Sequence, residues 1–182
     1  MSLLREAACS IIAREGEVRV MSIASGSAQC IFDALQGLPN VKILCVDSDI
    51  TAIEHSRELA KRYSISDVTW HTQDVRNPAI VEETTHFKPH IVEMVGLIDY
   101  FSDKAITHLC KRILGILDEK GFFITGHIHE NDEVHFLEVV SDWNMRYRSA
   151  EHLELLVRSS GFSHCQLFTE PHKIHTVCLA SR

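Results

Sequence analysis

The sequence predicts an α/β fold built on a mostly parallel sheet. Short, almost wholly apolar strand-like runs alternate with helical patterns along most of the chain. Strands of that kind are buried on both faces of a sheet, with helices covering each face. Only the four residues 170–173 separate the last two strand candidates, a length typical of a hairpin. One of those two strands is therefore expected to run antiparallel.

The expected elements follow one another without an internal repeat or a low-complexity linker. Strands are expected at residues 17–23, 41–46, 68–71, 91–95, 121–126, 165–169 and 176–180. Helices are expected at residues 1–16, 28–35, 50–63, 104–117 and 150–160. Gly121 and Gly161 are interpreted as stop signals for the two later helices. We expect one domain over residues 1–182 and leave open whether the N-terminal helix is the remnant of a longer chain.

Composition limits the class of protein and the class of partner. The 182 residues are 45% hydrophobic, enough for a sizeable core. No apolar run approaches the roughly 18 residues that a membrane span needs, and the first residues lack the layout of a signal peptide. The formal net charge of −7 disfavours nucleic acid as a partner, because an acidic surface repels phosphate backbones. Arg146, Arg148 and Arg158 form the single candidate basic patch.

The six cysteines indicate a reducing compartment. They form no CxxC pair, and several stand inside apolar runs. This pattern is typical of reduced, buried thiols in a cytoplasmic protein and not of a disulfide framework. The six are Cys9, Cys30, Cys45, Cys110, Cys165 and Cys178.

Candidate functional residues are sought just after each strand, because ligands bind at the carboxyl ends of strands in such sheets. The first strand is followed by the small residues Ala24–Ala28, where Gly26 can adopt a positive φ and the next helix offers free N–H groups. A single glycine is a weak signal, and an ordinary strand-to-helix turn explains the stretch about as well.

The second and third strands are each followed by an acidic residue. Asp47 stands 21 positions after Gly26, close to the spacing at which a carboxylate commonly accepts hydrogen bonds from ribose hydroxyls. Asp49 is suited to cap the following helix. Asp74 could accept a hydrogen bond from the exocyclic amine of adenine, although its surroundings taken alone favour a simple turn.

The fourth and fifth strands end in less usual segments. An apolar, aromatic and acidic run, residues 96–101, stands where solvated turn residues are expected, and it either lines a pocket or packs under the next helix. Residues 126–132 are rich in histidine and carboxylate. Their spacing fits no standard zinc pattern, so we expect no metal and favour a neutral histidine that binds substrate or moves a proton.

Together these residues resemble the class I S-adenosylmethionine-dependent methyltransferases. The segments that carry the resemblance are VMSIASGSAQ, ILCVDSDITAIEHS, HTQDVRN, GLIDYFSD and ILDEKGFFITGHI. The G-L-x-D-Y run and a later W-x-x-x-Y-R run further resemble a bacterial subgroup of small methyltransferases. The resemblance implies a Rossmann-like, doubly wound sheet of seven strands, mostly parallel with one antiparallel C-terminal strand, and helices on both faces.

The resemblance also implies a binding site for S-adenosylmethionine. This methyl donor has no phosphate, so a loop with one glycine argues against a dinucleotide more than against it. In the family a carboxylate often stands where this chain has Ser22 or Ala24. The residues implied to bind S-adenosylmethionine are Ser25, Gly26, Ser27, Asp47, Ser48, Asp49, Asp74, Val75, Gly96 and Leu97.

The chemistry implied is transfer of a methyl group to a small molecule, with O-methylation of a lipid-like or carboxylic acid as the leading expectation. The candidate catalytic residues are Asp99, Tyr100, His127 and Arg148, of which the arginine suits an anionic acceptor. One alternative is a non-catalytic S-adenosylmethionine-binding domain of a larger protein. A second is an RNA or protein methyltransferase. Whether the chain forms a homodimer or carries an additional domain is left open.

Overall fold

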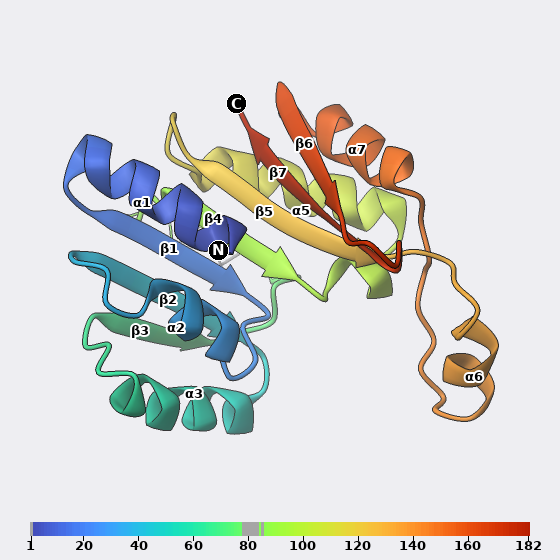
Figure 1. Ribbon diagram of the computed structural model, residues 1–182, viewed down its shortest axis with the longest axis horizontal. Coiled ribbons are helices and arrows are strands. Elements are labelled where there is room, and N and C mark those ends of the chain that lie inside the picture. Colours follow the sequence, from blue (N-terminus) through green and yellow to red (C-terminus); the bar gives the residue numbers. More distant parts are fainter. Residues whose placement is uncertain (1, 78–83, 85) are drawn as a thin grey trace. The chain divides into compact units, whose positions relative to one another are not determined.

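The computed structural model describes residues 2–77, 84 and 86–182. It confirms the predicted fold class: a seven-stranded sheet in the order β3-β2-β1-β4-β5-β7-β6, with helices around it (Figure 1). β1 pairs in parallel with β2 and β4, β2 pairs in parallel with β3, and β6 and β7 pair antiparallel. The strands are β1 Val18–Ile23, β2 Val41–Asp47, β3 Val68–Thr72, β4 Ile91–Val95, β5 Phe122–Ile128, β6 His164–Thr169 and β7 His175–Ser181.

The helices that the sequence predicts are all present, with ends shifted by one or two residues. They are α1 Leu3–Glu15, α2 Gln29–Leu35, α3 Ile50–Arg62, α5 Asp103–Ile116 and α7 Ala150–Ser159. Two further elements had no periodic signal in the sequence, the 3-10 turn η1 (Ile98–Tyr100) and the short helix α6 (Val134–Val139). A single turn and a six-residue helix are too short to show a helical period.

The chain divides into two compact units. Unit 1 comprises Met1–Glu93 and Ile116–Phe122, and unit 2 comprises Met94–Gly115 and Phe123–Arg182. That residues 1–182 form one domain stays a prediction.

Unit 1 is built from parallel strands whose registers align their carboxyl ends. Val18 pairs with Val41 and Ile43 pairs with Val68, so β1, β2 and β3 start and end at similar levels. α1 lies along β1, and α3 lies along β2 and β3 (Figure 1). As expected, Asp49 caps α3, with its carboxylate accepting a hydrogen bond from the Thr51 N–H at 2.8 Å.

Unit 2 packs α7 along the antiparallel pair β6 and β7 (Figure 1). The Ser149 hydroxyl caps the start of α7, and Gly161 beyond its end has φ +107°, in agreement with the predicted stop. The rings of Phe123 and Phe162 stack with centroids 5.4 Å apart in the core. Between β5 and α7 the chain makes a long excursion that holds α6 (Figure 1).

The role predicted for Gly121 as a helix stop is wrong. α5 ends at Ile116, and Gly121 lacks a positive φ. A Cβ at Gly121 would lie 2.8 Å from the His90 carbonyl oxygen and 2.9 Å from the Leu117 side chain. Glycine is needed here because two stretches of backbone approach closely.

All six cysteines are free thiols, as expected. Cys45, Cys110 and Cys178 are buried, whereas Cys30 is exposed. Burial raises the pKa of the Cys45 and Cys110 thiols to about 12, so both stay protonated. The cytoplasmic location inferred from this usage stays a prediction.

Candidate active site

The carboxyl ends of β1 and β2 bring Gly26 and Asp47 into contact. One carboxylate oxygen of Asp47, Oδ2, accepts a hydrogen bond from the Gly26 N–H at 2.7 Å. The other, Oδ1, accepts one from the Asp49 N–H at 2.9 Å. The carboxylate is thus fixed by backbone donors on both sides, while each oxygen keeps a lone pair for a further partner. Ser48 and Asp49 beside it are exposed.

In the loop after β1 every second residue has a positive φ, which the residue types do not indicate. Ala24, Gly26 and Ala28 have φ values of +54°, +52° and +55°. All three are therefore left-handed, a conformation that costs an L-residue roughly 1 kcal/mol or more. The backbone has three glycine-type positions, although only one is a glycine. Between them Ser25 and Ser27 are half-buried, and the Ser25 hydroxyl lacks a hydrogen-bond partner among the described residues.

The segment after β3 lies at the same edge of unit 1, because the Gln73 N–H donates to the Asp47 carbonyl at 2.8 Å. Asp74 accepts hydrogen bonds from the Arg76 guanidinium and from the Arg76 N–H, which together lower its pKa to about 2. This is the turn geometry that the sequence favoured. Val75 is buried, and a role for Asp74 and Val75 at an adenine stays a prediction. The Gln73 side-chain oxygen, which sequence reasoning passed over, is buried and has no hydrogen-bond partner in the described structure.

Sequence reasoning also missed Glu93. It lies in the otherwise apolar strand β4 and is only 8% exposed. The hydroxyl of the fully buried Ser22 on β1 donates to the Glu93 carboxylate at 2.6 Å. The available signal was an acidic residue inside the apolar run IVEMV.

In unit 2 the segment after β4 carries several of the predicted residues. Gly96 is exposed with φ +80°, and Leu97 after it is half-buried. Asp99, in η1, is only 2% exposed, and its Oδ1 accepts a hydrogen bond from the Ile128 N–H at 3.1 Å. Burial raises the pKa of this carboxyl above its ordinary value. Residues 96–101 were expected either to line a pocket or to pack under the next helix. Ile98 and Asp99 are buried, as the second alternative predicts, whereas Tyr100 is 48% exposed.

His127 at the end of β5 is held in its neutral form. Its Nε2 lies 2.9 Å from the Arg148 carbonyl oxygen, and because a carbonyl only accepts, Nε2 carries the proton. Nδ1 therefore presents a lone pair, and this atom is buried with no hydrogen-bond partner among the described residues. Burial, and then the nearby His129, lowers the pKa of His127 to about 4.

Arg148 is buried and fully engaged with its own chain. Its guanidinium donates to the carbonyls of Ile98 (3.3 Å), Phe101 (2.5 Å) and Arg146 (3.1 Å), and to the Asp103 carboxylate (3.0 Å). These bonds fix the segment that carries Asp99. Arg148 therefore positions this segment and is not itself expected to contact a substrate.

Three aromatic residues of unit 2 have polar groups that bear on the site. The Tyr100 hydroxyl accepts a hydrogen bond from the Trp143 indole N–H at 2.6 Å, and both rings are partly exposed. The hydroxyl of Tyr147 is buried and has no hydrogen-bond partner in the described chain. Burial raises its pKa, so the phenol stays protonated.

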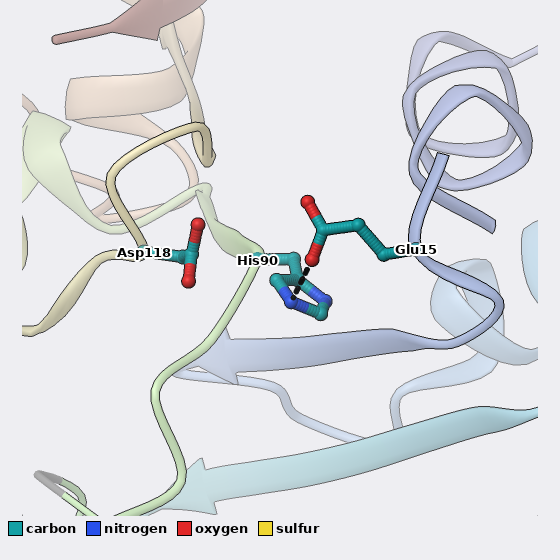
Figure 2. Close-up of side chains that lie close together, drawn as sticks. All are labelled: Glu15, His90 and Asp118. Carbon is teal, nitrogen blue, oxygen red and sulfur yellow. Dashed lines mark ion pairs between the residues drawn. The ribbon is translucent and has the colours of Figure 1, made fainter. Parts of the chain in front are cut away.

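A separate cluster, Glu15, His90 and Asp118, lies at the opposite, amino-terminal edge of unit 1, since His90 directly precedes β4 (Figure 2). Their potential ligand atoms lie within 4.8 Å of one another. His90 accepts the Arg19 N–H at Nδ1, so Nε2 carries the proton and faces Glu15 at 3.0 Å. The Arg19 guanidinium lies 2.6 Å from that Nε2 and 4.0 Å from Asp118. Arg14 pairs with Glu15, and Arg19 pairs with both Glu17 and Asp118, so the cluster is part of a structural ion network.

The candidate basic patch does not form a continuous cationic surface. Arg146 is exposed, but Arg148 is buried and Arg158 pairs with Glu154 at 2.7 Å. Within the described residues, no helix combines the length and the apolar character that crossing a membrane requires.

Comparison with known proteins places the chain in a family. The model of the family described as "Putative methyltransferase" matches residues 1–182. The Escherichia coli (strain K12) protein YnbC, described as uncharacterized, is 25% identical over 190 residues, which cover 99% of this chain. The chain spans about a third of the length of YnbC (32%).

Solved structures share the fold. A "putative O-methyltransferase" from Nostoc punctiforme PCC 73102 superposes with a TM-score of 0.72 and 17% identity, covering 99% of this chain and 57% of that one. The S-adenosylmethionine-dependent methyltransferase SibL, in its apo form, gives a TM-score of 0.70 and 17% identity, covering 97% of this chain and 53% of that one. Membership of the subgroup indicated by GLIDY and WNMRYR stays a prediction.

Proposed function

Because the chain belongs to the "Putative methyltransferase" family over its whole length, we propose that it is an S-adenosylmethionine-dependent methyltransferase that O-methylates a small molecule. The observation that carries the proposal is the Asp47 carboxylate, fixed by the Gly26 and Asp49 N–H groups. The methyl donor is also the cofactor of SibL, which shares the fold. S-adenosylmethionine supplies a methyl group activated by its sulfonium.

The residues present suit that cofactor. Asp47 has lone pairs left for the two ribose hydroxyls, and the unpartnered Ser25 hydroxyl and Gln73 oxygen offer polar contacts beside it. Ser27, Ser48 and Asp49 complete the polar rim, and Asp74 and Val75 are assigned to the adenine. That Gly96 and Leu97, which belong to unit 2, meet the sulfonium stays a prediction from the resemblance.

For the acceptor, the residues of unit 2 favour a hydroxyl over a carboxylate. The lone pair at His127 Nδ1 suits a group that donates a proton, and the Tyr147 hydroxyl can donate to an acceptor oxygen. The Arg148 guanidinium is occupied by three carbonyls and Asp103, which leaves it poorly suited to bind a carboxylate. We therefore assign His127 to take the hydroxyl proton as the methyl group would pass from sulfur to oxygen, with the S–C bond breaking as the O–C bond forms and a neutral thioether as the leaving group. Asp99, Tyr100 and Arg148 shape and hold the segment around it.

The surface of unit 2 suits an apolar acceptor. Large apolar side chains are exposed on and around α6, and Tyr100 adds to them. These side chains are Phe136, Val139, Val140 and Trp143. A lipid-like or aromatic alcohol matches both this surface and the neutral His127.

Calorimetric titration with S-adenosylmethionine tests the assignment of the cofactor. We expect Asp47→Asn to weaken binding roughly 10- to 100-fold, because a charged acceptor for the ribose is lost. The matched control Asp67→Asn changes an exposed carboxylate at the amino end of β3 and should leave binding unchanged. Absence of binding by the folded wild-type chain contradicts the proposal.

A non-catalytic S-adenosylmethionine-binding domain of a longer protein is the second candidate. The match to about a third of YnbC and the two left-handed alanines in the first loop favour it. Tight binding of S-adenosylmethionine, with no methyl transfer to a broad panel of alcohols, phenols and acids, would select this candidate over the enzyme.

A further inference from the structure

A buried carboxylate lies under the loop after β1. Glu93 is directly opposite Ser22 in the parallel pairing of β4 with β1, and Ser22 is the second-last residue of its strand. The Ser22 hydroxyl fixes the Glu93 Oε2 at 2.6 Å, and both residues are buried. The carboxylate therefore lies at the level where the strand passes into the loop that begins at Ala24.

The negative charge of Glu93 acts on two cysteine thiols, one in α2 and one in β2. Although Cys30, in the first turn of α2, is exposed as a residue, partial desolvation of its thiol raises the pKa, and the charge of Glu93 is the next cause. Glu93 also contributes to the raised pKa of Cys45, on β2, although there burial is the main cause. Cys30 follows the loop by two residues, and Cys45 pairs with Ser22 where β1 and β2 lie side by side, so the charge of Glu93 acts beside the loop.

Burying a carboxylate is costly unless positive charge or hydrogen bonds compensate it. The Ser22 hydroxyl is one hydrogen-bond partner of Glu93, and a neutral donor leaves the carboxylate its full negative charge. The proposed cofactor ends in an amino acid, whose α-ammonium is a cation able to form charge-assisted hydrogen bonds with a carboxylate. The loop itself offers serines, glycine and alanine, and no side chain of Ala24–Ala28 carries a negative charge.

We propose that Glu93, oriented by Ser22, is the carboxylate that receives the α-ammonium of the methionine portion of S-adenosylmethionine. The negative charge that selects this end of the cofactor then comes from β4, the strand next to β1, and not from β1 itself. This inference rests on the proposed function.

The test compares two ligands that differ at the amino-acid end. S-adenosylhomocysteine carries the α-ammonium, whereas 5′-methylthioadenosine keeps the nucleoside and the sulfur but lacks the amino acid. In calorimetric titrations we expect Glu93→Gln to weaken S-adenosylhomocysteine roughly 10- to 100-fold and to change 5′-methylthioadenosine less than about twofold. Asp47→Asn is the matched comparison and should weaken both ligands, because it acts on the ribose that they share.

A second measurement needs no variant at the buried site. Wild-type protein should bind S-adenosylhomocysteine at least about tenfold more tightly than its analogue without the α-amino group. Equal affinities for S-adenosylhomocysteine and its deamino analogue would overturn the inference. So would a folded Glu93→Gln protein in which S-adenosylhomocysteine and 5′-methylthioadenosine are weakened equally. If wild-type protein bound neither nucleoside, the proposed function itself would fail, which is a different result.

Discussion

The two units hold their predicted functional groups in opposite ways. In unit 1 the Asp47 carboxylate accepts hydrogen bonds from two backbone N–H groups and the Asp74 carboxylate from Arg76, so both carboxylates are held in place by their donors. In unit 2 the acid and the base are buried: the pKa of Asp99 is raised and that of His127 is lowered to about 4. Unit 1 is suited to bind a ligand by fixed charge, and unit 2 to keep His127 uncharged for proton transfer.

The largest expected effect is on the rate of methyl transfer, and it tests whether unit 2 carries the chemistry while unit 1 binds the cofactor. His127→Gln should lower the rate of methyl transfer about 10²- to 10⁴-fold, because the group that takes the proton is lost. Affinity for S-adenosylmethionine should change less than about twofold, since we assign the ribose and the ammonium to unit 1. Rates with a phenol acceptor and calorimetric titrations check both values.

His164→Gln, which changes an exposed histidine at the start of β6, is the control for that experiment. It should leave both quantities unchanged. A His127 variant that transferred methyl groups at the wild-type rate would remove the distinction between the units.

Arg148 should matter for stability more than for binding of the cofactor. Arg148→Met removes the buried hydrogen bonds to three carbonyls and to Asp103, and should lower the free energy of unfolding by about 3 kcal/mol. Urea denaturation followed by circular dichroism measures the change. Arg158→Met, at a half-exposed ion pair, should cost less than about 1 kcal/mol. Equal losses would show that the Arg148 bonds do not hold unit 2 together.

Lowering the pH should destabilise the protein through His127. The pKa of this histidine is 6.5 ordinarily and about 4 when folded, so the unfolded chain binds the extra proton first as the pH falls. The resulting stability is complete above about 6.5 and is lost progressively toward about 4, with a total of about 3 kcal/mol. His90, whose pKa is also lowered by burial, adds loss in the same direction.

Urea midpoints at several pH values between about 4 and about 7 measure this slope. His127→Gln should flatten it, whereas His164→Gln should not. An unchanged slope in the His127 variant would mean that the imidazole is not held neutral by the fold.

The smallest expected effect concerns the loop of unit 1. Ala24→Gly should raise the free energy of unfolding by up to about 1 kcal/mol, because glycine tolerates the left-handed φ of +54° that alanine does not. Ala52→Gly, inside α3, is the matched control and should lower it by about 1 kcal/mol. Thermal melts of the two variants and the wild-type protein measure these changes in stability. Destabilisation of both variants would contradict a left-handed φ at Ala24.

The sequence predicted the fold well because apolar runs and helical patterns are local signals. Seven strands and the helices α1, α2, α3, α5 and α7 lie where these patterns place them. The 21-residue spacing also anticipated the contact between Gly26 and Asp47, because two consecutive parallel strands end at one edge.

The rest depended on contacts between distant residues or on backbone angles, neither of which a pattern of residue types reveals. The left-handed φ of Ala24 and Ala28 was hidden because alanine seldom adopts that conformation. Glu93 needed the pairing of β4 with β1, 71 residues apart, to meet Ser22. Arg148 was interpreted from its charge as a ligand for anions, whereas its burial and its carbonyl partners emerge only from the folded chain.

A crystal structure with S-adenosylhomocysteine tests the central claim most directly, because it locates each end of the ligand in unit 1. We predict ribose hydroxyls within hydrogen-bond distance of the Asp47 carboxylate and the α-ammonium within hydrogen-bond distance of Glu93. A nucleoside bound away from the ends of β1 and β2 would contradict the account, whatever activity the protein shows.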